Sequence, residues 1–197
     1  MTALPPLRPR PDAAAFLATR RSRPAKTLAA PAPDSEALLP ILTAALRVPD
    51  HGKLEPWRLI VLEGAAPTRL ARLTGQLGQA RGLDPDKLAK AQAMFRDAPL
   101  MVAVVAAPVA SDKIPDVEQT LSAGALCLGL VNAALAAGWG ANWLSGWMAL
   151  DREWLDAGLD LAPHEWVAGF VVLGTETSAP PDRPRPDLGA KVDWVSA

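Results

Sequence analysis

The chain has 197 residues, of which 50% are hydrophobic and 21% are charged, and its formal net charge is -1 at pH 7. A chain of this length forms one domain or two small ones, and a single domain buries roughly 70% of the surface that its unfolded form exposes. The composition excludes disorder over most of the length. The near-neutral charge gives no indication of nucleic acid or an acidic membrane surface as a partner.

The N-terminal segment is predicted to differ from the rest of the chain. Residues 1–11 carry prolines and arginines without an apolar stretch, so we expect a flexible arm rather than a secretory signal. The remaining residues, 12–197, show no internal repeat and are expected to form a single domain.

Two helices are predicted next. Asp12 is expected to cap a helix that runs to about Arg20, because Pro24 prevents its continuation. Asp34 is expected to cap a second helix, whose apolar residues are spaced for one buried face and whose end carries Arg47.

Apolar strands and helices then interleave along the chain. Apolar runs predict strands at 57–62, 99–105, 141–143 and 166–173. Helical spacing predicts helices at 67–77, at 84–95, at 117–139 and from residue 151 onward. The proline-rich residues 179–186 are expected to form an extended arm. This order predicts a layered α/β domain, and no Gly-x-Gly-x-x-Gly motif follows the first strand, so a nicotinamide would not be held by a Rossmann motif.

The longest apolar segment, Val117–Trp139, is predicted to be a helix buried at the centre of a soluble domain. Glu118, Gln119, Ser122 and Asn132 interrupt it. A membrane-spanning helix needs about 20 nearly unbroken apolar residues, so a core helix is favoured over a span.

The single cysteine, Cys127, lies within this apolar segment. A lone cysteine excludes an internal disulfide and argues against a cysteine-based metal site, so we predict a buried, inert thiol. Because the chain has only one cysteine, we expect the protein to be in a reducing compartment, the cytoplasm. No metal site is predicted, because His164 has no histidine or cysteine partner at a ligand spacing.

Two polar clusters are the candidate functional residues. Arg20-Arg21-Ser22 is rich in guanidinium groups, whose planar fork suits phosphate oxygens. The same arginines also suit a solvated helix C-terminus, where the helix dipole favours positive charge. His51 follows Asp50, and a histidine beside an aspartate is, by itself, most often an ordinary hydrogen-bonded loop residue.

These clusters also carry a family resemblance. Arg20-Arg21-Ser22 after a first helix, then Pro49-Asp50-His51 before Pro56-Trp57, resemble the short-chain nitroreductase family of FMN-dependent NAD(P)H oxidoreductases. The resemblance runs from about Phe16 to Trp194. It implies an α+β fold, a nitroreductase-like three-layer α-β-α arrangement with a central mixed sheet and an intertwined homodimer.

The resemblance also implies which residues bind cofactors. Arg20, Arg21 and Ser22 would contact the flavin's ribityl phosphate and ring edge, while Arg47 and His51 would reach the flavin across the dimer interface. The other implied flavin contacts are Trp143, Leu144, Ser145, Gly174, Arg183 and Arg185. The implied contacts with the nicotinamide cofactor are Ala133, Ala134, Leu135, Ala136, Ala137 and Gly138.

Two positions depart from the family pattern. Glu55 stands where many members have a glutamine, and Leu144 stands where close relatives are expected to have an arginine. Positive groups near the ring, namely Arg21, Arg47 and His51, would stabilise the negative charge that reduction places on the flavin and so raise its potential.

The resemblance implies an oxidoreductase in which FMN carries the redox chemistry and NADH or NADPH is the electron donor. Its partner would be a small-molecule electron acceptor of nitroaromatic, quinone-like or similar electron-poor type, with no nucleic acid and no membrane involved. His51 is the candidate proton donor, alongside water. Two alternatives are a flavin-processing enzyme that consumes reduced flavin with oxygen, and a non-catalytic FMN-binding or storage protein.

Overall fold

The computed structural model describes residues 6–196. Residues 1–5 of the predicted N-terminal arm lie outside the described residues, whereas residues 6–10 have no regular structure and are exposed. The helices are α1 (Pro11–Thr19), α2 (Ser35–Ala45), α3 (Ala66–Ala80), α4 (Pro85–Arg96), α5 (Asp116–Ala136) and α6 (Arg152–Leu159). The strands are β1 (Leu28–Ala29), β2 (Trp57–Leu62), β3 (Leu100–Ala106), β4 (Gly140–Leu144) and β5 (Trp166–Glu176).

The five strands form one sheet. Its order is β1-β5-β3-β2, and β4 pairs with β5 as well. All strand pairings within residues 6–196 are antiparallel, so the α+β class is confirmed but the sheet within the chain is not the predicted mixed one. The helices α3 and α4 connect β2 to β3 and bring the chain back to the end of β2. β3 therefore runs antiparallel to β2, and Met101 near its start pairs with Leu62 at the end of β2.

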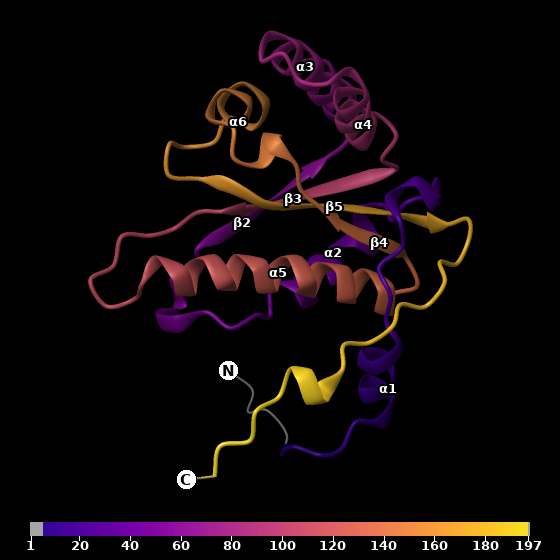
Figure 1. Cartoon of the computed structure of the whole chain (residues 1–197), viewed down its shortest axis with the longest axis vertical. Helices are drawn as coiled ribbons and strands as arrows, with labels where there is room; N and C mark the ends of the chain where they lie inside the picture. Colours follow the sequence, from indigo (N-terminus) through magenta and orange to yellow (C-terminus); the bar gives the residue numbers. More distant parts are fainter. Residues whose placement is uncertain (1–5, 197) are drawn as a thin grey trace.

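Helices cover both faces of the sheet (Figure 1). α2 and α5 pack on one face, and α3, α4 and α6 lie over the other. Successive residues of β3 therefore alternate between two cores: Met101, Ala103 and Val105 face α3, α4 and α6, whereas Val102 and Val104 face α2 and α5. Because both faces are covered, β3 is apolar at every position rather than at every second one.

The predicted cap at Asp34 is confirmed, and aspartates also cap α4 and α6. The side chains of Asp34, Asp84 and Asp151 accept hydrogen bonds from backbone N–H groups three residues on, at 2.9, 3.0 and 2.9 Å. Asp12 does not cap α1, and that prediction is wrong: Pro11 occupies the first helical position, so Asp12 lies inside the first turn.

The last strand is longer than predicted. β5 continues past Leu173 to Glu176, because the two-residue strand β1 pairs with Thr175 and Glu176. Nothing in the local sequence marks β1, which exists only through this pairing. Residues 179–187 form no helix or strand and are mostly exposed, as predicted for an extended arm.

α5 is buried on one face only. Its inner face packs against the sheet and α2, where Cys127 is fully buried and burial raises the pKa of its thiol to about 12, as expected of an inert cysteine. Its outer face exposes Val117, Leu121 and Leu128, at 61%, 67% and 45%. Among residues 6–196, α5 alone has the length and composition of a membrane span, with 44% of its apolar window buried inside the protein.

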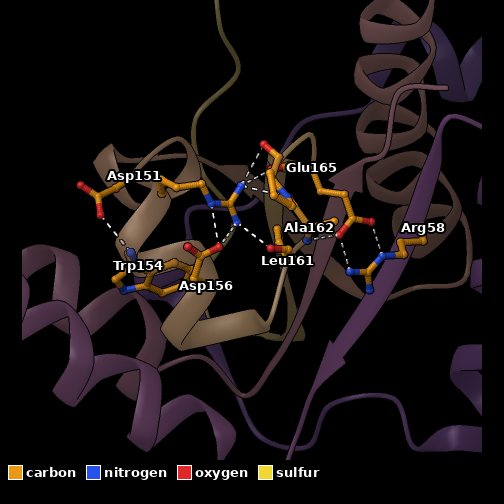
Figure 2. A network of polar contacts seen from close by, with 9 residues as sticks. Arg58, Asp151, Trp154, Asp156, Leu161, Ala162 and Glu165 are labelled. Carbon is orange, nitrogen blue, oxygen red and sulfur yellow. Dashed lines mark hydrogen bonds and ion pairs between the residues drawn. The ribbon is translucent and has the colours of Figure 1, made fainter. Parts of the chain in front are cut away.

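A network of arginine contacts orders the loop between α6 and β5 (Figure 2). The guanidinium of Arg152 donates to the carbonyls of Leu161 and Glu165, at 2.8 and 2.9 Å. Arg58 on β2 donates two hydrogen bonds to the Glu165 carboxylate, at 2.7 and 2.8 Å, and Ala162 N–H donates a third at 2.9 Å. The nearly buried carboxylate is thereby satisfied and ties the loop to the sheet.

This carboxylate predicts a pH-dependent stability. Hydrogen bonding from Arg58 holds the pKa of Glu165 below its ordinary value of 4.5, against the opposing effect of burial. The ionised form therefore stabilises the folded state above about pH 4.5, and this contribution is lost as pH falls through the lowered pKa. We expect Glu165→Gln to lower the free energy of unfolding by about 1–3 kcal/mol at pH 7. In urea titrations this difference should shrink as the pH falls below about 4.5, and Glu63→Gln, which changes an exposed acid, is the control.

Candidate functional site

Arg20, Arg21 and Ser22 form an extended segment after α1. The segment is fixed to the sheet by its neighbour Arg23, whose N–H donates to Ala141 O at 2.9 Å. The Asn142 side chain donates to Arg23 O at 2.8 Å. Arg23 also forms an ion pair with Glu176 of β5. The arginines therefore lie beside the beginning of β4, at the C-terminal end of α5.

The C-terminal arm brings two further arginines to this segment. A cavity of about 320 Å³ is lined by Leu17, Arg20, Arg21, Ser22, Arg183 and Arg185. Arg185 holds the arm in place: its guanidinium donates to Ala18 O at 3.1 Å and to the Asp182 carboxylate at 3.2 Å. The structure thus brings Arg20, Arg21 and Ser22 together with Arg183 and Arg185 of the C-terminal arm, whose role the sequence had left open.

No acidic residue of the described chain lines this cavity, and Asp182, beside it, pairs with Arg185. Burial lowers the pKa of Arg20, and the neighbouring charges of Arg21 and Arg185 lower it further. The Nε atoms of Arg20 and Arg21 are buried and have no hydrogen-bond partner among the described residues. Arg20 does donate to Ser22 Oγ at 3.0 Å. Unpartnered buried donors on clustered cations are suited to a multiply charged oxyanion such as a phosphate monoester.

The predicted ring contacts lie along β4 and just beyond it. Trp143 is 41% exposed, and its indole N–H donates to Ala168 O at 3.3 Å. A Cβ at Gly169 would overlap this indole, so the glycine is what allows the ring to lie across β5. Leu144 is half-buried and Ser145 is exposed.

The stretch predicted for the nicotinamide cofactor forms the end of α5. Ala134 is fully buried in the core, Ala133 and Leu135 are half-buried, and Ala136, Ala137 and Gly138 are exposed. Gly138 has φ +86° and turns the chain into β4. These residues therefore lie at the same end of α5 as the segment from Arg20 to Ser22. Ala134 packs in the core.

Gly174 has a packing role in the structure. It is buried on β5 opposite Gly140, and a Cβ there would approach Ala29 O and the Pro99 ring at 2.9 Å each. It does not line the arginine cavity. The close approach of strands explains a glycine at this position.

Arg47 and His51 are not brought to the arginine cavity within one chain. His51 Nδ1 lies 2.7 Å from Glu118 Oε2, in the first turn of α5. With a rise of about 1.5 Å per residue, the 18 steps from Glu118 to Ala136 span about 27 Å of helix. Arg47 is exposed just beyond α2. His51 and the arginine cavity thus belong to opposite ends of α5, whereas the end of α2 that precedes Arg47 lies beside Gly129 of α5.

A second cavity, of about 360 Å³, lies at the N-terminal end of α5. It is lined by Pro49, Asp50, His51, Pro56, Ile114, Glu118, Gln119, Leu121, Ser122 and Ala125. The sequence interpretation did not single out Glu118 or Ser122 as site residues. Their spacing of four residues places both on one helix face and is the signal that could have identified them.

A family model described as "Nitroreductase family" matches residues 17–175. The chain is 38% identical over 165 residues to YdjA of Escherichia coli (strain K12), which is provisionally named an NAD(P)H nitroreductase. The match covers 83% of this chain and 88% of YdjA.

Solved structures share the fold. A nitroreductase-like family protein from Bacillus cereus superposes with a TM-score of 0.75 at 20% identity, over 100% of both chains. A protein from Desulfovibrio desulfuricans, provisionally named a nitroreductase and solved in complex with FMN, superposes with a TM-score of 0.71 at 20% identity, over 93% of this chain and 97% of that one. At these identities the structural likeness establishes the fold.

Proposed function

The chain belongs to the nitroreductase family, and we propose that it reduces nitroaromatic, quinone-like or related electron-poor acceptors. It is an NAD(P)H-dependent oxidoreductase with FMN as its cofactor. The observation that carries the proposal is the arginine cavity, where the buried Nε atoms of Arg20 and Arg21 have no partner among residues 6–196.

The residues of this cavity fit the phosphate of FMN. Arg20, Arg21, Arg183 and Arg185 provide forked donors, and Ser22 provides a hydroxyl already hydrogen-bonded to Arg20. Trp143 to Ser145 follow along β4, on the side proposed for the ring. When bound, FMN passes electrons from NAD(P)H to the acceptor, so no protein nucleophile is needed. The protein's own contribution is to bind, orient and balance charge.

We also propose a homodimer with two composite flavin sites. Each chain carries the arginine cavity at one end of α5 and His51 at the other. The exposed apolar face of α5 lies between them, with Leu121 and Leu128 at 67% and 45% exposure. A two-fold axis through the exposed face of α5 would pack the two copies of this helix antiparallel to each other. His51 and Arg47 of one protomer would then lie beside the arginine cavity of its partner.

The single domain of residues 12–197 and a cytoplasmic location are part of the same proposal. The single domain is supported by the one sheet that all the described strands form. The location is supported by the lone cysteine, Cys127, which is buried and forms no disulfide. Small-molecule acceptors are the proposed partners, with neither nucleic acid nor membrane required.

The proposed function is tested by the absorption spectrum of the purified protein. We expect a yellow protein whose flavin band is bleached by NADPH or NADH under anaerobic conditions and restored by a quinone or nitroaromatic acceptor. Retained FMN without any bleaching would indicate a storage protein instead. Under air, destruction of the flavin itself, seen by product analysis, would indicate a flavin-processing enzyme.

A further inference from the structure

The turn that carries His51 is strained and held in place. Gly52, Lys53 and Glu55 all have positive φ, at 75°, 55° and 48°. Two of these three are not glycine, and such residues keep this conformation only where surrounding contacts impose it. Asp50 supplies such contacts: its carboxylate accepts the N–H groups of Leu54 and Glu55, at 3.1 and 2.9 Å.

α5 clamps both ends of the same turn. Trp57 Nε1–H donates to Ser122 Oγ at 2.9 Å, and Ser122 Oγ–H donates to Pro49 O at 2.7 Å. One helical turn earlier, Glu118 Oε2 lies 2.7 Å from His51 Nδ1. The strained turn, its clamp and its carboxylate partner therefore present the imidazole at one defined place, at the rim of the 360 Å³ cavity.

Glu118 is the acid that is paired with the imidazole. The titratable groups that line this cavity besides His51 are Asp50 and Glu118. The carboxylate of Asp50 is occupied by the turn's own N–H groups, and Lys53, in the same turn, lines no part of the cavity. Because an ionised carboxylate only accepts hydrogen bonds, its contact with Nδ1 requires the hydrogen there, which leaves Nε2 for other partners.

We propose that Glu118 is the positioning residue of His51, and that His51 Nε2 delivers the proton that reduction of the acceptor consumes. The proposal rests on the proposed function. NAD(P)H supplies two electrons and one hydrogen nucleus, whereas a quinone takes up two electrons and two protons to become a hydroquinone. One proton per turnover therefore comes from elsewhere.

The imidazolium form of His51 can supply this proton from Nε2. The neutral ring that remains is the Nδ1–H tautomer, which Glu118 already holds, so the ring need not turn. Because the His51 side chain is 65% exposed in the single chain, water can restore the proton. The apolar residues that line this cavity include Pro49, Ile114 and Ala125, which suit the ring of an aromatic acceptor.

The first test needs no electron donor. The chain has two histidines, so imidazole ¹⁵N spectra of the FMN-bound protein can be assigned with a His164→Gln variant. We expect the Nδ1–H tautomer for His51 in the unsubstituted protein and in Glu36→Gln. Glu36 is the matched control, since it is also an acid in the first turn of a helix. In Glu118→Gln we expect the Nε2–H tautomer that is usual in water.

The second test separates proton delivery from structural damage. With a quinone acceptor, Glu118→Gln should slow reoxidation of the flavin by about tenfold to a hundredfold, a typical effect of removing a positioning partner. With ferricyanide, which takes up an electron without a proton, the rate should stay within twofold. The double variant with His51→Gln should be no slower than His51→Gln alone, because Glu118 acts through His51.

Two results would overturn the proposal. An unchanged tautomer in Glu118→Gln, or equal slowing with quinone and ferricyanide, would remove Glu118 from proton delivery in a working enzyme. A wild-type protein that binds FMN but takes no electrons from NAD(P)H would instead overturn the proposed function, and the proton delivery with it.

Discussion

Replacing Arg20 with alanine is expected to weaken FMN binding by about tenfold to a hundredfold. A charge-assisted hydrogen bond contributes about 1.5–3 kcal/mol, and each 1.4 kcal/mol is a factor of about ten in Kd. This loss is expected at Arg20 because its Nε is buried without a partner in the described chain. The positive charges of Arg21 and Arg185 also lie close to its guanidinium group. Titration of FMN fluorescence with the apoprotein measures the change.

Two further variants sharpen this experiment. Arg20→Lys keeps the charge but loses the fork, so it should recover only part of the affinity. Arg72→Ala removes an exposed arginine in the middle of α3 and should bind FMN like the unsubstituted protein. An Arg20→Ala protein with unchanged affinity would exclude Arg20 from the flavin site.

Replacing Leu121 with glutamate is expected to abolish the dimer and, with it, tight FMN binding. Leu121 is 67% exposed on the outer face of α5, and obligate dimers commonly bury more than about 2,000 Å² in a core-like contact. A charge in the centre of such a contact would be buried without a partner. The proposed site also needs both protomers, because His51 and the arginine cavity lie at opposite ends of α5.

Light scattering with absorbance detection measures mass and bound flavin together. The unsubstituted protein should have twice the chain mass of 20.7 kDa and two flavins, whereas Leu121→Glu should elute near 20.7 kDa without flavin. Leu150→Glu is the control, since Leu150 is 72% exposed and lies two residues before α6, whose core residues pack on the other face of the sheet. An unsubstituted monomer that binds FMN tightly would rule out the composite site.

The candidate site was only partly predictable from the sequence. Arg20 to Ser22 and His51 were identified from short motifs, because their chemistry is visible in neighbouring residues. Glu118 was not, because it lies 67 residues from His51 and contacts it only in the folded chain. The role of the tail was likewise open, since Arg185 reaches Ala18 across 167 residues.

The sequence by itself determined the features that depend on residues within a few positions of one another. The cap at Asp34 and the apolar run of β3 are such features, since capping bonds and side-chain periodicity are local. Only the tertiary structure decided the antiparallel sheet, the strand β1 and the separation of His51 from the arginine cavity. These depend on where α5 and the C-terminal arm pack, and that is set by burial summed over the whole chain rather than by any one segment.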